Sequence, residues 1–124
     1  MSNNTHNKRK ILIADDDAAI LDALKMMLEE TDYEVVTTAD GQVVRDIKEP
    51  LPSIILLDIW MSGMDGTKIC EYLKKHEATK HIHIILFSAN KDTEKLAKEC
   101  GADDFISKPF QMNDLLNKIA AYSD

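Results

Sequence analysis

The chain has 124 residues, 44% of them hydrophobic and 30% charged, and its formal net charge is −7 at pH 7. This length supports one domain with one sizeable core, and the composition is typical of a soluble globular protein. The acidic balance argues against general nucleic-acid binding, which needs a basic surface. It leaves two interpretations: a ligand or partner that carries positive charge, or an acidic surface that only keeps the protein soluble.

The first nine residues are polar and lack the apolar stretch of a secretory signal. We therefore expect a flexible N-terminal tail over 1–9 and a single domain over 10–124. No apolar run is long enough to span a membrane, so we expect a cytoplasmic protein without membrane contacts. Cys70 and Cys100 form no C-x-x-C motif and stand beside apolar neighbours, which predicts buried free thiols.

Five short segments rich in β-branched, aromatic or other apolar residues predict strands. In chain order they are 11–14, 33–38, 54–58, 81–87 and 104–107. The third is apolar without a break from Ile54 to Leu57 and then ends at Asp58. Such a run is typical of a strand covered on both faces in the middle of a parallel sheet.

Apolar residues at helical spacing predict a helix after each strand. The helices are expected over 18–30, 41–48, 67–76, 92–100 and from 112 to at least 119. Asp17 can cap the first helix, and Gly101 can take the left-handed conformation after the fourth. Gly63 and Gly66 bracket a tight loop over 62–66.

Strict alternation of strands and helices predicts a parallel sheet with helices on both faces. Acidic residues follow the first strand (Asp15 to Asp17) and end the third (Asp58). If these acids share one site, the first and third strands are neighbours. We therefore predict a doubly wound α/β fold with five parallel strands in the order 2-1-3-4-5.

Adjacent parallel strands lie roughly 4.8 Å apart, which would bring Asp15 or Asp16 within a few ångström of Asp58. Carboxylates this close repel one another unless a cation compensates them, and Mg²⁺ favours such oxygen ligands. The plainer alternative is that Asp15 to Asp17 only cap a helix and that Asp58 only begins a loop.

Two more polar residues are expected at the same edge of the sheet. Ser88 ends the fourth strand beside Asp58, and Lys108 follows the fifth strand roughly 10 Å away, within reach of a long side chain. Taken alone, Ser88 is more typical of a turn and Lys108 of a solvent-exposed position. Together with a cation and a carboxylate nucleophile, they suit phosphoryl transfer onto Asp58.

Four segments carry a resemblance to a known family: ILIADDD, IILLDIWMSGMDG, LFSAN and DFISKPF. In this order and at this spacing they resemble the response-regulator receiver domain of two-component signalling, over residues 10–121. The resemblance implies a flavodoxin-like (CheY-like) fold. It also implies a phosphoacceptor that promotes its own phosphotransfer and dephosphorylation, rather than an enzyme acting on a separate substrate.

The resemblance implies a role for each site residue. Asp15 and Asp16 would hold Mg²⁺ together with Asp58 and the backbone carbonyl of Trp60. Asp58 would accept the phosphoryl group, with Ser88 and Lys108 on its oxygens.

The implied phosphoryl donor is a sensor histidine kinase or a histidine phosphotransferase. The implied output is a downstream protein target, with no nucleic acid bound by this chain. The alternative is a stand-alone phosphorelay intermediate that passes the group to another histidine.

The resemblance further implies a cis Lys108–Pro109 bond and an aromatic switch at Phe105. Phe105 lacks the hydroxyl of the family's frequent tyrosine, so only ring burial is expected to carry a switch. Ser62 stands where the family often has proline, which should loosen that loop slightly. Trp60 and Asn90 would flank the site, and a bulky indole there suggests a long-lived phosphorylated state.

Three rival classes fit the residues less well. A dehalogenase-like phosphohydrolase needs a second acid two residues after the nucleophile, where Trp60 stands. A nucleotide-binding domain needs a glycine-rich loop after the first strand. An interaction domain that keeps only the fold would be expected to lack one of the acids. The chain ends at Asp124, so its output would be its own docking surface if it is complete, and another domain if it is not.

Overall fold

A computed structural model describes residues 9–61 and 63–122. Apart from Arg9, the expected tail over 1–9 therefore lies outside the described residues, and so does the loosening expected at Ser62. Within the described residues the predicted α/β architecture is confirmed.

Five parallel strands form the central sheet, in the spatial order β2-β1-β3-β6-β7. Their bounds are β1 Lys10–Ala14, β2 Glu34–Thr38, β3 Ile54–Asp58, β6 His83–Ser88 and β7 Asp104–Ser107. Counted within this sheet alone, the order is 2-1-3-4-5, as predicted. The register pairs Ala14 with Leu57, so β1 and β3 run side by side to their carboxyl ends.

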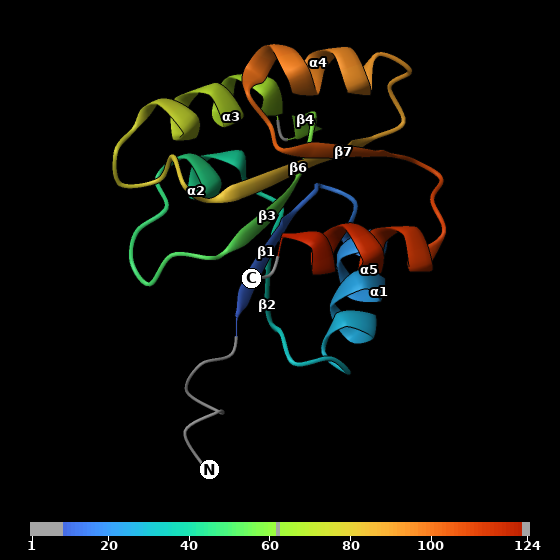
Figure 1. The fold of residues 1–124 in the computed structure, drawn as a ribbon. Coiled ribbons are helices and arrows are strands. Elements are labelled where there is room, and N and C mark those ends of the chain that lie inside the picture. The colour runs from blue at the N-terminus through green and yellow to red at the C-terminus, as the bar shows by residue number, and fades with distance from the viewer. Residues whose placement is uncertain (1–8, 62, 123–124) are drawn as a thin grey trace.

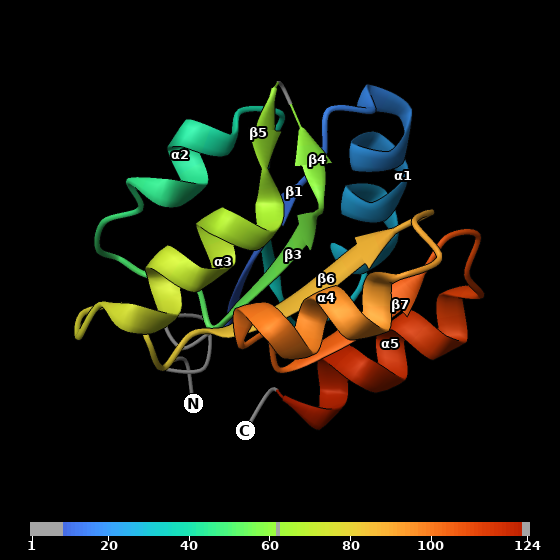
Figure 2. The same cartoon turned by 90° about the horizontal axis from the view of Figure 1, so that it is seen from above.

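The helices form one layer on each face of the sheet (Figures 1 and 2). They are α1 Ala18–Leu28, α2 Gly41–Arg45, α3 Gly66–Lys75, α4 Thr93–Cys100 and α5 Met112–Ala121. Figure 1 shows α1 and α5 below the sheet and the other three above it. None of the helices in the described part of the chain is long and apolar enough to cross a bilayer.

Alternation along the strands divides the core in two. Leu12, Ile55 and Leu57 pack with α2, α3 and α4, whereas Ile11 and Ile13 pack with α1 and α5. Every residue of β3 is buried, which is why that strand reads as an unbroken apolar run. The site-bearing ends of β1 and β3 therefore rest on core packed from both sides.

The segment expected as a tight loop over 62–66 includes a small antiparallel ribbon instead. Trp60–Met61 (β4) pairs with Met64–Asp65 (β5), and Gly63 takes a φ of 78° in the turn between them. Met61 is fully buried and anchors the ribbon in the core. Strands of two residues carry no periodicity, so the pattern of the sequence could not reveal them.

Several boundaries differ from the predicted ones by two or three residues. α2 ends at Arg45, three residues early, and α1 ends at Leu28 rather than 30. The fourth strand of the sheet begins at His83 rather than 81, because the Ile82 N–H donates to the Thr79 carbonyl in a preceding turn. Two expected ends are confirmed: Asp17 caps α1, and Gly101 ends α4 with a φ of 85°.

Candidate functional site

Three carboxylates meet where β1 and β3 end. Asp58 is the last residue of β3, and Asp15 directly follows β1. Ligand oxygens of Asp15, Asp16 and Asp58 all lie within 4.8 Å of one another. Asp15 is only 1% exposed and Asp58 9%, whereas Asp16 faces solvent. The structure therefore brings these acids together at this edge of the sheet, as predicted.

Asp15 is held by contacts from three directions. Its backbone N–H donates to the Thr38 carbonyl at 3.1 Å, which continues the pairing of β1 with β2. One carboxylate oxygen accepts the Asp17 N–H at 2.9 Å, and the other accepts a hydrogen bond from Lys108 at 2.6 Å. These bonds fix a buried carboxylate that points into the acidic cluster.

Lys108 reaches both buried acids. Its Nζ lies 2.6 Å from Asp15 Oδ2 and 3.6 Å from Asp58 Oδ2, as expected for a long side chain leaning across the sheet edge. The same ammonium sits 4.7 Å from the centre of the Phe87 ring, a cation–π contact. Its backbone N–H donates to the Ser88 carbonyl at 2.9 Å. The Lys108–Pro109 bond is cis, as the family resemblance implies.

The Lys108 ammonium does not fully offset the effect of burial on the pKa of Asp58. Burial and the neighbouring Asp15 raise the pKa of Asp58 from 3.8 to about 6, and Lys108 and the Ile59 N–H offset only part of this rise. The two buried carboxylates, Asp15 and Asp58, share the Lys108 ammonium, so this pair has an excess of negative charge. It is the kind of oxygen-rich group that a hard divalent cation neutralises.

The remaining predicted residues, Ser88 and Trp60, lie on strands that adjoin or follow β3. Ser88 ends β6, one position beyond the Phe87 that pairs with Asp58. Its hydroxyl oxygen accepts the Asn90 N–H at 3.2 Å. Trp60 lies on β4, two residues after Asp58, and is 60% exposed. The structure thus places Ser88 at the end of the strand beside Asp58 and Trp60 two residues after Asp58, while their expected roles stay predictions.

Gly66 is a residue whose importance sequence reasoning missed. A Cβ at this position would collide with the Asp58 carbonyl oxygen and crowd the backbone of Ile59. The Gly66 N–H also donates to the Ile59 carbonyl. The start of α3 therefore packs directly on the chain that leaves the acidic cluster. In the sequence, Gly66 is marked only by its place eight residues after Asp58. That place does not distinguish a glycine needed for a turn from one needed for close contact with the backbone at Asp58.

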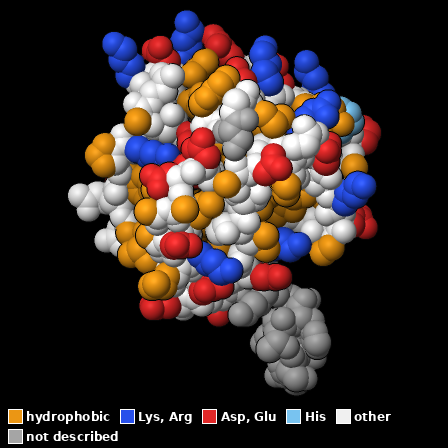
Figure 3. Space-filling model, turned by 180° about the vertical axis from the view of Figure 1, so that it is seen from behind, with side chains coloured by type: hydrophobic (Ala, Val, Ile, Leu, Met, Phe, Trp, Pro, Cys, Tyr) orange, Lys and Arg blue, Asp and Glu red, His pale blue; other side chains and the backbone are white. Residues whose placement is uncertain are grey.

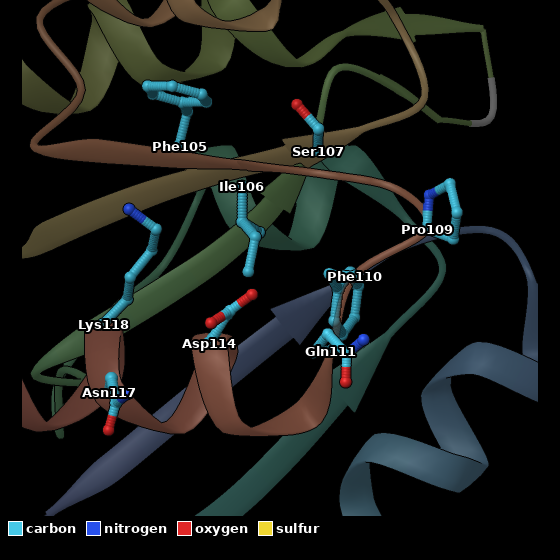
Figure 4. Close-up of a pocket in the computed structure, with 9 residues that line it drawn as sticks. All are labelled: Phe105, Ile106, Ser107, Pro109, Phe110, Gln111, Asp114, Asn117 and Lys118. Carbon is cyan, nitrogen blue, oxygen red and sulfur yellow. The ribbon is translucent and has the colours of Figure 1, made fainter.

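A groove between β7 and α5 contains the predicted switch residue. It has a volume of about 500 Å³ and includes Phe105, Ile106 and residues of α5. Figure 4 shows Phe105 and Ile106 on opposite faces of β7, with Lys118 reaching up from α5. The Lys118 ammonium lies 5.5 Å from the Phe105 ring centre and 3.0 Å from Asp104. Phe105 is half-buried: it packs against the core and also lines the groove.

Comparison with known proteins places the chain in a family. The model of the response regulator receiver domain matches residues 11–120, so the chain belongs to the response regulator receiver domain family of two-component signalling. Phosphorylation on an aspartate is a general property of this family.

The chain is 32% identical over 117 residues to the DNA-binding response regulator MtrA of Mycolicibacterium paratuberculosis. The same identity holds for MtrA of Mycobacterium tuberculosis. The matches cover 92% of this chain but only 51% and 50% of those proteins. The chain therefore spans about half the length of the curated relatives it matches.

Solved structures confirm the fold. A putative response regulator from Chloroflexus aurantiacus superposes with a TM-score of 0.86 at 27% identity, covering 94% of this chain and 98% of that one. The receiver domain of a signal transduction histidine kinase from Syntrophus aciditrophicus gives a TM-score of 0.83 at 33% identity. That match covers 92% of this chain and 89% of the other. The predicted flavodoxin-like, CheY-like fold is thus confirmed.

Proposed function

We propose that this chain accepts a phosphoryl group on Asp58 from a phosphohistidine of a sensor histidine kinase or histidine phosphotransferase. The reaction requires Mg²⁺, and its product changes a protein-docking surface. The observation that carries the proposal is the contact of Lys108 with two buried carboxylates, Asp15 and Asp58, which are otherwise under-compensated. A structural ion pair needs one acid, whereas this arrangement holds three.

The donor set fits a magnesium ion. Asp15, Asp16 and Asp58 offer carboxylate oxygens close enough to share a cation, and the pKa of Asp58, raised by burial and by Asp15, supports a cation there. The Trp60 carbonyl is proposed as a further ligand from the family resemblance. When bound, the ion neutralises charge on the transferring phosphoryl oxygens.

The residues of the chain account for the rest of the transfer. With a pKa of about 6, Asp58 is ionised at neutral pH, so its oxygen can attack phosphorus as the bond from phosphorus to the donor imidazole breaks. Lys108 supplies an ammonium to the equatorial oxygens, and Ser88 supplies a hydroxyl from the neighbouring strand. Buried packing around β3 fixes the nucleophile in place.

Phosphorylation is proposed to act on the groove between β7 and α5. Lys108 directly follows β7, the strand that carries Phe105, and its ammonium contacts Asp58. A new charge on Asp58 therefore displaces Lys108 and, through it, the end of this strand. A phosphoryl oxygen that draws Ser88 inward gives the Phe105 ring room to turn. Such a switch needs two packings that differ by only a few kcal/mol.

The docking partner is proposed to be a protein rather than a nucleic acid or a membrane. The net charge of −7 disfavours nucleic acid. On the face turned away from the viewer of Figure 1, acidic, basic and hydrophobic side chains are interspersed (Figure 3). As part of this proposal the chain works in the cytoplasm.

A second candidate is a relay intermediate that returns the phosphoryl group to another histidine. The relatives named as DNA-binding regulators are about twice as long as the matched segment. The output of this chain is therefore proposed to be either its own docking surface or a part of a longer protein. Mixing phosphorylated chain with a histidine phosphotransferase other than its donor tests the relay, since only a relay intermediate passes the group on to it rapidly.

The direct test is intact mass after incubation with phosphoramidate, whose phosphorus–nitrogen bond mimics that of phosphohistidine. A gain of about 80 Da is expected with Mg²⁺ and not with a chelator. Asp58→Asn should abolish the gain, and Asp16→Asn should raise the Mg²⁺ concentration that it needs. Asp17→Asn is the matched control, because Asp17 only caps α1 and asparagine caps equally well. A gain that persists in Asp58→Asn contradicts the proposal.

A further inference from the structure

The two cysteines lie against each other across the interface of α3 and α4. Cys70 is on α3 and Cys100 is the last residue of α4, thirty residues later. The Cys70 thiol donates to the Cys100 carbonyl at 3.5 Å, and the Cys100 thiol to the Ala97 carbonyl at 3.6 Å. Both thiols are free and are 0% and 4% exposed. The phosphoacceptor chemistry uses neither of them.

The two thiols differ in character. Their mutual contact raises the pKa of Cys70 and lowers the pKa of Cys100, and the Ala102 N–H adds to the lowering. Because Cys100 ends its helix whereas Cys70 is enclosed within α3, we take Cys100 as the nucleophile of the pair and Cys70 as the thiol that resolves it. Cys100 is followed by Gly101 in a left-handed conformation. Local opening of this last turn would expose its sulfur without unfolding the domain.

We propose that Cys70 and Cys100 form an intramolecular disulfide when the chain meets a peroxide. The Cys100 thiolate attacks one peroxide oxygen, the O–O bond breaks, and the leaving oxygen departs as water after protonation. The Cys70 thiol then attacks the sulfur of the resulting sulfenic acid. The S–S bond forms, the S–O bond breaks, and the leaving hydroxide takes the Cys70 proton. Two thiols are oxidised and one peroxide is reduced to two waters.

The bond ties α3 to α4. Closing a loop of this length restricts the unfolded chain, so oxidation should raise the melting temperature by on the order of 5–10 °C. It also limits any movement of α4 relative to α3. An effect on switching rests on the proposed function, whereas the formation of the cross-link does not, so the two can fail separately.

The test is a peptide map of the wild-type chain after mild hydrogen peroxide, with free thiols blocked by alkylation under denaturing conditions. Trypsin places Cys70 in peptide 69–74 and Cys100 in peptide 99–118, since it does not cleave before Pro109. The two peptides should be recovered linked from monomeric protein and should separate on reduction. Alkylated cysteines in both peptides, oxygen added to either sulfur, or cross-linked dimers would overturn the proposal.

Two variants test the roles of the thiols. In Cys70→Ser, the Cys100 sulfenic acid has no resolving partner and should be trapped by dimedone. In Cys100→Ser, Cys70 should stay reduced under the same treatment. Trapping at Cys70 instead of Cys100 would contradict the assigned nucleophile. Because the peptide map uses the wild-type chain, the proposal stays testable even if a variant folds poorly.

Discussion

Asp58 should make the unphosphorylated domain less stable at neutral pH. Its carboxyl has a pKa of about 6 in the folded chain against 3.8 for the ordinary group, because it is buried beside Asp15. A rise of about two pH units corresponds to about 3 kcal/mol of unfolding free energy. Because folding raises this pKa, the protonated carboxyl does not lower the free energy of unfolding. The ionised carboxylate does, and the loss grows as pH rises from about 4 to above 6.

Asp58→Asn removes this penalty with little change of shape. Without Mg²⁺ at pH 8, the variant should be more stable than wild type by about 2–3 kcal/mol, which moves the urea midpoint by about 1–2 M. At pH 4 the gain should fall well below about 1 kcal/mol, since wild-type Asp58 is then largely protonated. Adding Mg²⁺ should stabilise wild type more than the variant.

Asp40→Asn is the matched control for this experiment. Asp40 is an exposed cap of α2, and the substitution removes one carboxylate charge away from the cluster. Its stability should stay within about 0.5 kcal/mol of wild type at both pH values. If Asp58→Asn were no more stable than wild type at pH 8, or if its gain did not depend on pH, the buried charge would not be under-compensated.

Three further variants examine separate parts of the site. Lys108→Met leaves Asp15 buried without its ammonium, so Mg²⁺-free urea denaturation should show a loss of about 2–3 kcal/mol; unchanged stability would contradict this pairing. Trp60→Ala should release the phosphoryl group faster, on the order of two- to fivefold, because the indole no longer screens water; an equal rate of mass loss would reject that hypothesis. Gly66→Ala should cost more than about 2 kcal/mol, since its Cβ meets the backbone at Asp58. Gly41→Ala is the comparison and should cost less, because the atoms nearest its Cβ belong to the side chains of Met64 and Ile69 rather than to backbone.

The sheet and its strand order could be predicted from the positions of the acidic residues in the sequence. The apolar run that ends at Asp58 indicated a central strand, and the acids after Ala14 indicated its neighbour. The register of β1 and β3 confirms this inference. Lys108 could be placed as well, since its reach follows from strand spacing alone.

Other features depend on tertiary contacts that no local pattern encodes. The ribbon of β4 and β5 exists because Met61 is buried in the core, and strands of two residues have no period to detect. The close approach of Gly66 to Asp58 depends on how α3 packs. Cys70 and Cys100 were correctly expected to be buried, but their contact follows from the spacing of two helices.

Asp58 itself is expected to carry the phosphoryl group, and to do so only with Mg²⁺. Borohydride reduces an aspartyl phosphate to homoserine, so sequencing by mass spectrometry can locate the modified residue. After treatment with phosphoramidate and Mg²⁺, homoserine should appear at position 58 and should be absent when a chelator replaces the metal. Homoserine at another aspartate, or at position 58 with equal yield in the presence of chelator, would contradict Mg²⁺-dependent phosphorylation of Asp58.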